Sequence, residues 1–381
     1  MKRLTLTLLL MILTLLCLAN VNRTYLIDKP VITENTSYTS IALSNAQSWG
    51  DPGNPNLPWV GIKLLLPTST EANSIIVKRS NPITYMVNKP IEPIQQQYPF
   101  SHKTMEAVTT PNALIYTSQN EYPVAENNGL STYYLSGNPI AFSAVCPFTY
   151  YPQDNKLVFY QTISVEISYT TSERGLEASS LLKQDAFTQA RIQHSVDNPE
   201  MFRSSDSRPL GYNYLMIIDQ AKYDNWLPLK TLYESRGMNV LVKSVSEITA
   251  NVAGADTQQK IRNFIIQTYA TNPLRYVFLG GDTDVIPHRG MYVNLGQGSY
   301  TDEDIPADMY YSCLDGNWDN DADGNWGENG EEDLAPELAI GRFCYNSNQE
   351  IANFLNKVMS YVMAPVESEI RTAFFAGEWL W

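Results

Sequence analysis

The sequence of 381 residues predicts a β-sandwich followed by an α/β domain with a doubly wound, mainly parallel sheet. Up to about residue 171, short apolar segments alternate with Pro, Gly and Asn, which is typical of antiparallel strands joined by turns. From about residue 211, apolar runs alternate with helical stretches, which is typical of parallel strands joined by crossover helices. The expected boundaries are residues 20–171 for the sandwich, 172–210 for a helix and linker, and 211–381 for the α/β domain.

The strands of the sandwich are predicted from apolar runs and from the turns that end them. A buried strand is expected over residues 59–66, where Pro67 follows. The polar segment 152–155 predicts a turn between strands over residues 141–151 and 156–169. In the second of these strands, apolar residues recur at a period close to two: Val158, Tyr160, Ile163, Val165, Ile167 and Tyr169. That alternation indicates a strand with one buried face.

The α/β domain begins with an apolar run suited to a parallel strand that is buried on both faces. Strands are expected over residues 214–218, 239–242 and 276–279, and helices over 226–236, 260–269 and 351–362. Right-handed crossovers then produce a parallel sheet, and a further strand is expected to begin at residues 372–376. Between the domains, residues 176–192 predict one helix and residues 204–209 an exposed linker, which makes Arg203 a candidate processing site.

The N-terminus predicts export from the cell. Met1-Lys2-Arg3 precedes an apolar run from Leu4 to Leu18, and Ala19 is a small residue at a plausible cleavage point. The run is too short to span a membrane comfortably, and no other segment approaches spanning length. The alternative, lipidation at Cys17, is disfavoured by the bulky residue before it. We therefore expect a signal peptide over residues 1–19 and a secreted or cell-surface protein.

The acidity of the chain is local. Twelve carboxylates and no Lys or Arg lie between Asp302 and Asp333, and they carry most of the net charge of −14. With no basic patch available, nucleic acid is not an expected partner. Alternating carboxylates followed by Gly324 repel one another unless a hard cation gathers them. The candidate ligands are Asp319, Asp321, Asp323, Asn325 and Glu328.

We expect this acidic loop to bind calcium in a structural role, and the alternative is a merely solvated loop. The loop departs from an EF-hand because Gly330 occupies the twelfth position, where a bidentate Glu is needed. Glu328 or Glu331 is a possible substitute. Two cysteines, Cys313 and Cys344, flank the loop, and a disulfide between them is one possibility.

Several short motifs resemble the gingipain family of secreted cysteine peptidases. They are the run from Tyr276 to Pro287, the segment Asp315-Gly316-Asn317-Trp318, and the segment from Glu337 to Arg342. Residues 53–58 are similar to the propeptide of that family. The resemblance implies a caspase-like catalytic domain made as a zymogen, with the N-terminal domain as its intramolecular inhibitor. It also implies protein or peptide substrates, cleaved through a thiolate and an acyl-enzyme.

The resemblance also implies where the catalytic residues lie. The family's nucleophilic Cys and its His, which follows a Gly, would come after residue 381, so the chain is expected to be a truncated and inactive part of a longer protease. Glu378 matches a family carboxylate that orients the catalytic His, although it could also be an ordinary Glu in a truncated strand. Asp282 and Glu337 are similar to family acids near a calcium site.

Two other functions remain open on sequence alone. One is a calcium-stabilised exported binding or adhesion module without catalysis. The other is a phosphate-binding doubly wound domain, which we rank last because the turn from Gly280 to Asp284 is too acidic to favour phosphate without a metal.

Overall fold

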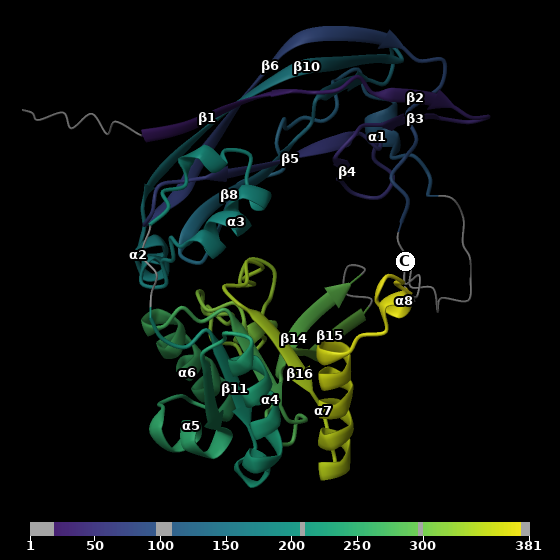
Figure 1. The fold of residues 1–381 in the computed structure, drawn as a ribbon. Coiled ribbons are helices and arrows are strands. Elements are labelled where there is room, and N and C mark those ends of the chain that lie inside the picture. Colours follow the sequence, from purple (N-terminus) through teal and green to yellow (C-terminus); the bar gives the residue numbers. More distant parts are fainter. Residues whose placement is uncertain (1–18, 97–108, 206–209, 296–299, 375–381) are drawn as a thin grey trace, which may run out of the picture.

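The computed structural model describes residues 19–96, 109–205, 210–295 and 300–374, which form an antiparallel β unit and an α/β unit (Figure 1). The expected signal peptide lies outside the described residues except for Ala19, which begins the first strand. No helix within these ranges has the length and apolar character needed to cross a membrane.

The first unit consists of two antiparallel sheets around one apolar core. One sheet has the order β1-β10-β6, with β9 on β10, and the other has the order β4-β5-β8-β7. The strands are β1 (Ala19–Leu26), β4 (Ala46–Ser48), β5 (Pro58–Leu65), β6 (Thr70–Met86), β7 (Ser131–Leu135), β8 (Asn138–Val145), β9 (Phe148–Tyr151) and β10 (Lys156–Thr171). A small hairpin, β2 (Val31–Glu34) and β3 (Thr39–Ala42), and a short helix, α1 (Ala113–Tyr116), complete the unit. The predicted β-sandwich is confirmed.

The register of β10 corrects part of the sequence prediction. Ile163, Val165 and Ile167 are buried as expected, but the core residues before them are Leu157 and Phe159. Val158 and Tyr160, which were assigned to the buried face, therefore point to the opposite face. A strict period of two, counted back from Ile163 through Gln161, would have given the observed phase.

The segment between the units forms two helices where one was expected. They are α2 (Glu173–Ser179) and α3 (Ala186–Ser195). Each has its own N-cap, because the side chain of Ser172 accepts a hydrogen bond from Gly175 N and that of Asp185 accepts one from Thr188 N. Such capping residues start a helix, and the second cap breaks the predicted helix in two.

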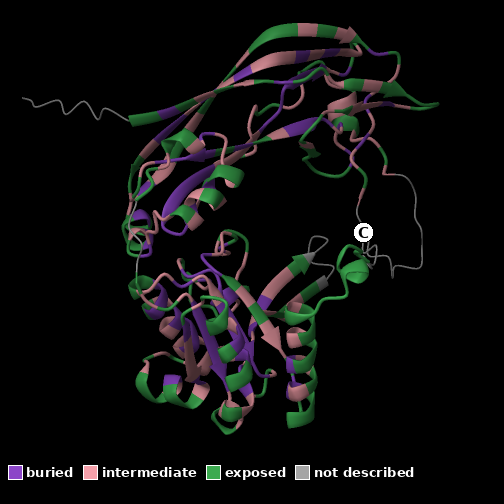
Figure 2. Ribbon diagram, viewed as in Figure 1, coloured by how far each residue is buried: buried purple, intermediate pink, exposed green. Residues whose placement is uncertain are grey.

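The second unit is built on a fully parallel sheet of order β12-β11-β13-β16. Its strands are β11 (Tyr214–Ile218), β12 (Val240–Ser244), β13 (Tyr276–Gly280) and β16 (Ala339–Phe343), and its helices are α4 (Tyr223–Ser235), α5 (Val245–Asn251), α6 (Thr257–Thr271) and α7 (Asn348–Met363). Helices α4 and α7 share one apolar cluster with the sheet, and α5 and α6 share the other. The predicted doubly wound α/β class is confirmed, and the buried strands stand out in Figure 2.

Two features of this unit differ from expectation. A hairpin, β14 (Arg289–Leu295) and β15 (Tyr300–Ala307), follows β13 and was not anticipated. At the other end, α8 (Glu367–Ile370) follows α7, and residues 372–374 form no strand, so the strand predicted to begin there is wrong for these residues. Residues 375 and 376 of that prediction lie outside the described ranges.

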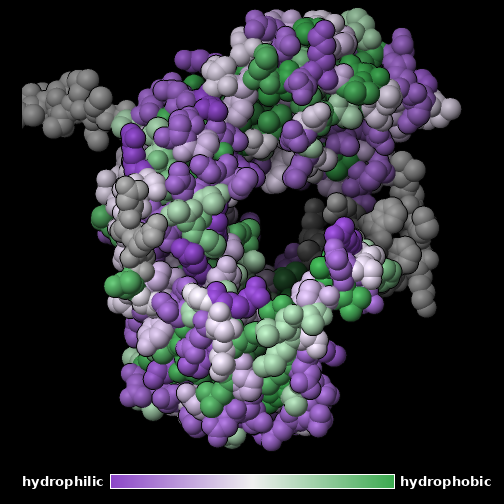
Figure 3. Space-filling model, viewed as in Figure 1, coloured by the Kyte–Doolittle hydropathy of each residue, from purple (hydrophilic) through white to green (hydrophobic). Residues whose placement is uncertain are grey.

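The two units meet at α2, α3 and the neighbouring loops (Figure 1), and an opening between the units is visible in the middle of the view in Figure 3. The contacts there include hydrogen bonds of Lys183 and Arg191, an ion pair between Asp185 and Arg275, and packing of Leu181 against the α/β unit. Those of Arg191 lie on the acidic segment that precedes β16. That segment contains the candidate site.

Candidate metal centre

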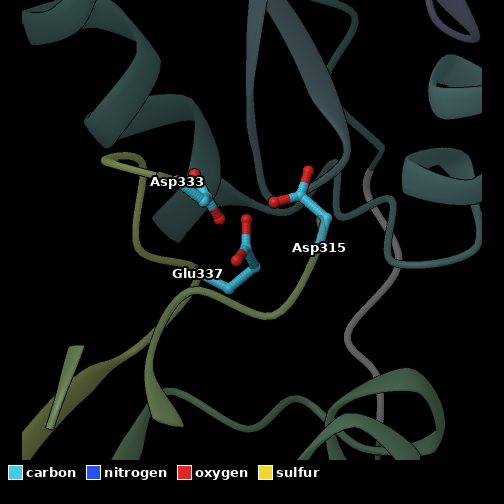
Figure 4. A group of neighbouring side chains, drawn as sticks. All are labelled: Asp315, Asp333 and Glu337. Carbon is cyan, nitrogen blue, oxygen red and sulfur yellow. The ribbon is translucent and has the colours of Figure 1, made fainter. Parts of the chain in front are cut away.

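Three carboxylates from distant positions in the acidic segment meet just before β16. Asp315, Asp333 and Glu337 have carboxylate oxygens within 4.8 Å of one another, and their side chains point toward one another (Figure 4). Only 7% of Asp333 and 1% of Glu337 is exposed. Because Glu337 precedes β16, the cluster lies at the amino-terminal edge of the parallel sheet, and we call these three residues the buried triad.

Hydrogen bonds hold some oxygens of the buried triad and leave others free. Glu337 Oε2 accepts a hydrogen bond from Leu314 N at 2.7 Å, and Glu337 Oε1 accepts one from Ser136 N at 3.0 Å. Asp333 Oδ1 accepts one from Ala335 N at 3.0 Å. In contrast, Oδ2 of Asp315 and Oδ2 of Asp333 are buried without any hydrogen-bond partner. Unpaired buried carboxylate oxygens are costly, so these two atoms indicate a missing cation or proton.

The electrostatics of the buried triad favour either bound protons or a cation. Burial, followed by the neighbouring acids, raises the pKa of Asp333 and of Glu337 well above the usual range, and burial is also the main cause of the raised pKa of Asp315. Three mutually repelling carboxylates in a dry site either take up protons or share a positive ion. A hard divalent cation with a preference for oxygen ligands, such as Ca²⁺, fits this donor set.

The arginines near the triad offset its charge only in part, because burial outweighs the pull of Arg174 and Arg262 on the pKa of Asp315 and that of Arg191 on the pKa of Glu337. Arg262 is buried, and its guanidinium donates to the carbonyl oxygens of Tyr310 at 2.9 Å, Cys313 at 2.9 Å and Asp315 at 2.8 Å. Arg191 likewise donates to a backbone carbonyl, that of Glu337, at 2.8 Å. Among the described residues, no Lys or Arg forms an ion pair with any of the three carboxylates.

The first unit covers the triad. Besides Ser136 N on Glu337, the guanidinium of Arg191 on α3 donates to the carbonyl oxygens of Pro336 and Glu337. Nearby, Lys183 Nζ donates to the carbonyl of Tyr269 at 2.8 Å. A cavity of about 220 Å³ between the units reaches Asp315 and offers a route to it from solvent. The triad is therefore part of the interface between the two units.

The exposed acidic loop forms a second group of carboxylates. Oxygens of Asp319, Asp321 and Asp323 lie within 4.8 Å of one another, and Asp321 does the same with Glu328 and Glu331. All five acids thus gather around Asp321. The side-chain amide of Asn325 donates to Asp323 Oδ2 at 2.9 Å, which leaves the backbone carbonyl of Asn325, the predicted ligand, untested. Burial and the neighbouring aspartates raise the pKa of Glu328, as expected for crowded acids.

Other predicted site residues lie apart from these groups. Asp282 follows β13, at the carboxyl-terminal edge of the sheet, where its side chain accepts a hydrogen bond from Thr283 N. Glu337 lies at the opposite edge, so the structure does not bring the two together. Glu378, the candidate that orients a catalytic His, lies outside the described residues.

Sequence reasoning missed Asp315 and Asp333 as ligands. Asp315 was noted only as part of a family motif, and Asp333 only as the end of the acidic run. Seventeen residues lie between them, and the hydrogen bond from Gly327 N to Trp318 O at 2.6 Å closes part of the loop that joins them. The usable signal for Asp315 was its position directly after the buried segment that ends at Leu314, and Asp333, which precedes the exposed Leu334, had no comparable signal.

The cysteines show no arrangement suited to nucleophilic catalysis. Cys146, Cys313 and Cys344 are all free, so the possible disulfide between the last two is not formed. Burial raises the pKa of Cys146 to about 12 and raises that of Cys313. Cys344 is exposed, but slight burial and its hydrogen bond to Asp282 raise its pKa as well. An active thiolate needs a lowered pKa.

The comparison with protein families identifies the class of both units. Residues 24–196 match the model Propeptide_C25, and residues 207–380 match the model described as Peptidase family C25. The fold fits this assignment, because an antiparallel sandwich precedes a parallel α/β unit. The chain belongs to peptidase family C25, a family of cysteine peptidases, and carries the propeptide of that family before the peptidase domain. The resemblance to gingipains is confirmed.

Solved structures of gingipains show weaker similarity. The complex of Porphyromonas gingivalis RgpB pro- and mature domains matches at 16% identity and a TM-score of 0.39, covering 48% of this chain and 92% of that one. A structure of gingipain K from Porphyromonas gingivalis, described as giving insight into its zymogenic latency, matches at 18% identity and a TM-score of 0.34. The match covers 40% of this chain and 88% of that one. The Arg-specific cysteine proteinase gingipain R matches at 22% identity and a TM-score of 0.29. The match covers 41% of this chain and only 30% of that one. No curated protein matches the chain.

Proposed function

We propose that the chain is part of a secreted cysteine endopeptidase precursor of the gingipain type, kept latent by its own propeptide. The observation that carries this proposal is the interface at Glu337, where the propeptide donates a backbone N–H to a buried carboxylate of the peptidase domain. The apolar N-terminal run supports export to the cell surface or beyond. Proteins and peptides would be the substrates.

The proposed chemistry is acyl transfer through a thiolate. The sulfur attacks the peptide carbonyl, the amine leaves with a proton from a His, and water then cleaves the acyl-enzyme. None of the three described cysteines meets the needs of this step, so we place the nucleophile and its His outside the described residues. Glu378 would orient that His, in keeping with the family resemblance.

The 381-residue chain should show no peptidase activity of its own. We expect no cleavage of fluorogenic peptides by the purified chain, because the nucleophile is not among Cys146, Cys313 and Cys344. Cleavage that persists in a variant with all three cysteines changed to Ala would contradict the thiolate mechanism. Cleavage lost through one of these changes would instead place the nucleophile among them.

Continuation of the gene offers a test that is independent of activity. Sequencing the DNA downstream of the Trp381 codon should reveal an open frame with a Gly-His-Gly segment and a later Cys at a strand end. If no such segment exists, the raised pKa values of all three cysteines favour the second candidate, an exported calcium-stabilised binding or adhesion module without catalysis.

We also propose that calcium occupies the buried triad and the exposed acidic loop. Its contribution would be positive charge that neutralises neighbouring carboxylates and fixes the loop between Asp315 and Glu337. The unpaired Oδ2 atoms of Asp315 and Asp333 support the first site, and the carboxylates gathered around Asp321 support the second.

Two substitutions should separate these calcium sites. Asp333→Asn should remove the buried site and leave the loop site, because Asp333 belongs only to the triad. Asp321→Asn should do the opposite, because Asp321 is common to both groups of loop acids. Equilibrium dialysis with radioactive Ca²⁺ would measure the loss of one site in each variant. Unchanged stoichiometry in either variant would exclude the corresponding site.

A further inference from the structure

We infer that cation binding at the buried triad and docking of the propeptide are coupled, so that each strengthens the other. The inference rests on the proposed calcium at Asp315, Asp333 and Glu337, and adds a regulatory role to it. The propeptide would hold the cation in place in the latent protein, and loss of the cation would loosen the propeptide.

The propeptide contact on the triad is rigidly presented. Ser136 and Gly137 form the two-residue turn between β7 and β8, and both have positive φ, at 52° and 73°. This conformation is that of a tight hairpin turn. A Cβ at Gly137 would lie 2.6 Å from Leu182 Cα, so the turn is packed closely against the segment after α2. The N–H of Ser136 therefore reaches Glu337 from a fixed position.

Docking of the propeptide also removes water from the triad. Ser136 is 1% exposed and lies directly on Glu337, and Arg191 covers the backbone of Pro336 and Glu337. Burying three carboxylates that only backbone N–H groups and distant arginines compensate opposes docking. A divalent cation among them removes most of that penalty, so docking is more favourable when the cation is bound. By thermodynamic reciprocity, the cation then binds more tightly when the propeptide is docked.

Arg191 provides a way to test the coupling without changing a ligand. Its guanidinium holds the backbone of the segment that carries Asp333 and Glu337, but it donates to carbonyls and not to the carboxylates. Lys183 tests the same coupling at a distance from the triad. It is also a propeptide cation that donates to two backbone carbonyls across the interface, those of Tyr269 and Asn272, at the end of α6.

Arg191 could act on the triad as a nearby charge or as a docking contact, and the two roles predict opposite changes in Ca²⁺ affinity when its side chain is removed. If Arg191 acted only as a nearby positive charge, its removal would make the triad more attractive to Ca²⁺. If propeptide docking stabilises the cation, its removal weakens the site. We expect Arg191→Ala to lower the Ca²⁺ affinity of the triad about 5-fold or more, within the range of ordinary coupling between sites. Lys183→Ala should also lower that affinity, because Lys183 anchors the same interface away from the triad. Loss of affinity in Arg191→Ala alone would indicate local positioning of the ligand segment, and would overturn coupling through docking.

The experiment is calorimetric titration of Ca²⁺ into the full chain carrying Asp321→Asn, which silences the exposed loop. Equal or tighter binding by Arg191→Ala would overturn the coupling while the site itself stands. If the parent chain and its Asp333→Asn variant take up Ca²⁺ equally, the proposed buried site fails, and the coupling fails with it.

A second readout tests whether Ca²⁺ bound at the triad tightens docking of the propeptide. Hydrogen exchange of the peptide containing Ser136 should slow on addition of Ca²⁺ in the parent chain, and should not change in the Asp333→Asn variant. Ca²⁺-independent exchange in a parent chain that binds Ca²⁺ at the triad would also overturn the coupling. Circular dichroism of the variants would show that each retains its fold.

Discussion

Replacement of Gly137 by Ala should be among the most destabilising single changes in the propeptide. Gly137 has φ of 73°, where an L side chain is disfavoured by roughly 1–2 kcal/mol. The added Cβ would also lie 2.6 Å from Leu182 Cα and 2.7 Å from Ala178 O, and neither backbone atom can move without displacing α2 or its following turn. Together we expect a loss of about 3 kcal/mol or more in the free energy of unfolding.

Gly129→Ala is the matched control for this prediction. Gly129 lies in the same unit and also has positive φ, at 109°, but a Cβ there meets no atom within 4 Å. Its cost should be limited to the conformational part, roughly 1–2 kcal/mol. Urea unfolding followed by tryptophan fluorescence measures both variants. Equal destabilisation would mean that crowding against Leu182 contributes nothing.

Removal of the Arg262 side chain should have the second large effect. This buried arginine on α6 donates to the carbonyl oxygens of Tyr310, Cys313 and Asp315, and so fixes the chain that leads into the triad. In Arg262→Ala these carbonyls lose their donor inside the protein, and a cavity remains. Each unsatisfied buried acceptor costs about 1–3 kcal/mol, so we expect a total loss of about 3–5 kcal/mol in stability.

Two further variants define what Arg262 contributes. Arg262→Lys keeps the charge but cannot reach several carbonyls with one ammonium, so most of the loss should persist. Arg371→Ala removes an exposed arginine that pairs with Glu367 one helical turn away, and it should cost no more than about 0.5 kcal/mol. The urea concentration at the midpoint of unfolding would compare the stability of Arg262→Ala, Arg262→Lys and Arg371→Ala. Full stability of Arg262→Lys would show that charge, and not hydrogen-bond geometry, is what matters.

The sequence predicted the elements of this fold better than it predicted the site. Apolar runs such as that of β13 are local signals, and their order implied the parallel sheet. The phase of β10 was misjudged because apolar Val158 and Tyr160 lie on its outer face, where composition alone cannot distinguish them from core residues. The prediction of one helix over 176–192 was wrong because the capping residue Asp185, which starts a second helix, was not recognised.

The metal centre was harder to predict because its contacts are distant along the chain. Ser136 and Glu337 are separated by 201 residues, and no local pattern records their hydrogen bond. The exposed loop was found because its aspartates alternate within five residues. Asp315 and Asp333 carry no such spacing, and only the folded chain shows that their side chains approach each other and Glu337.

The position of the interface has a consequence for how latency is released. The described hydrogen bonds between the units involve Tyr269, Asn272 and Arg275 before β13, and Pro336 and Glu337 before β16. In open α/β sheets, ligands bind at the other end of the strands. Occupation of that end by a peptide would therefore not compete for these anchoring contacts. The strength of the anchoring contacts would then depend on cation concentration, and occupation of the opposite edge of the sheet would depend on peptide concentration.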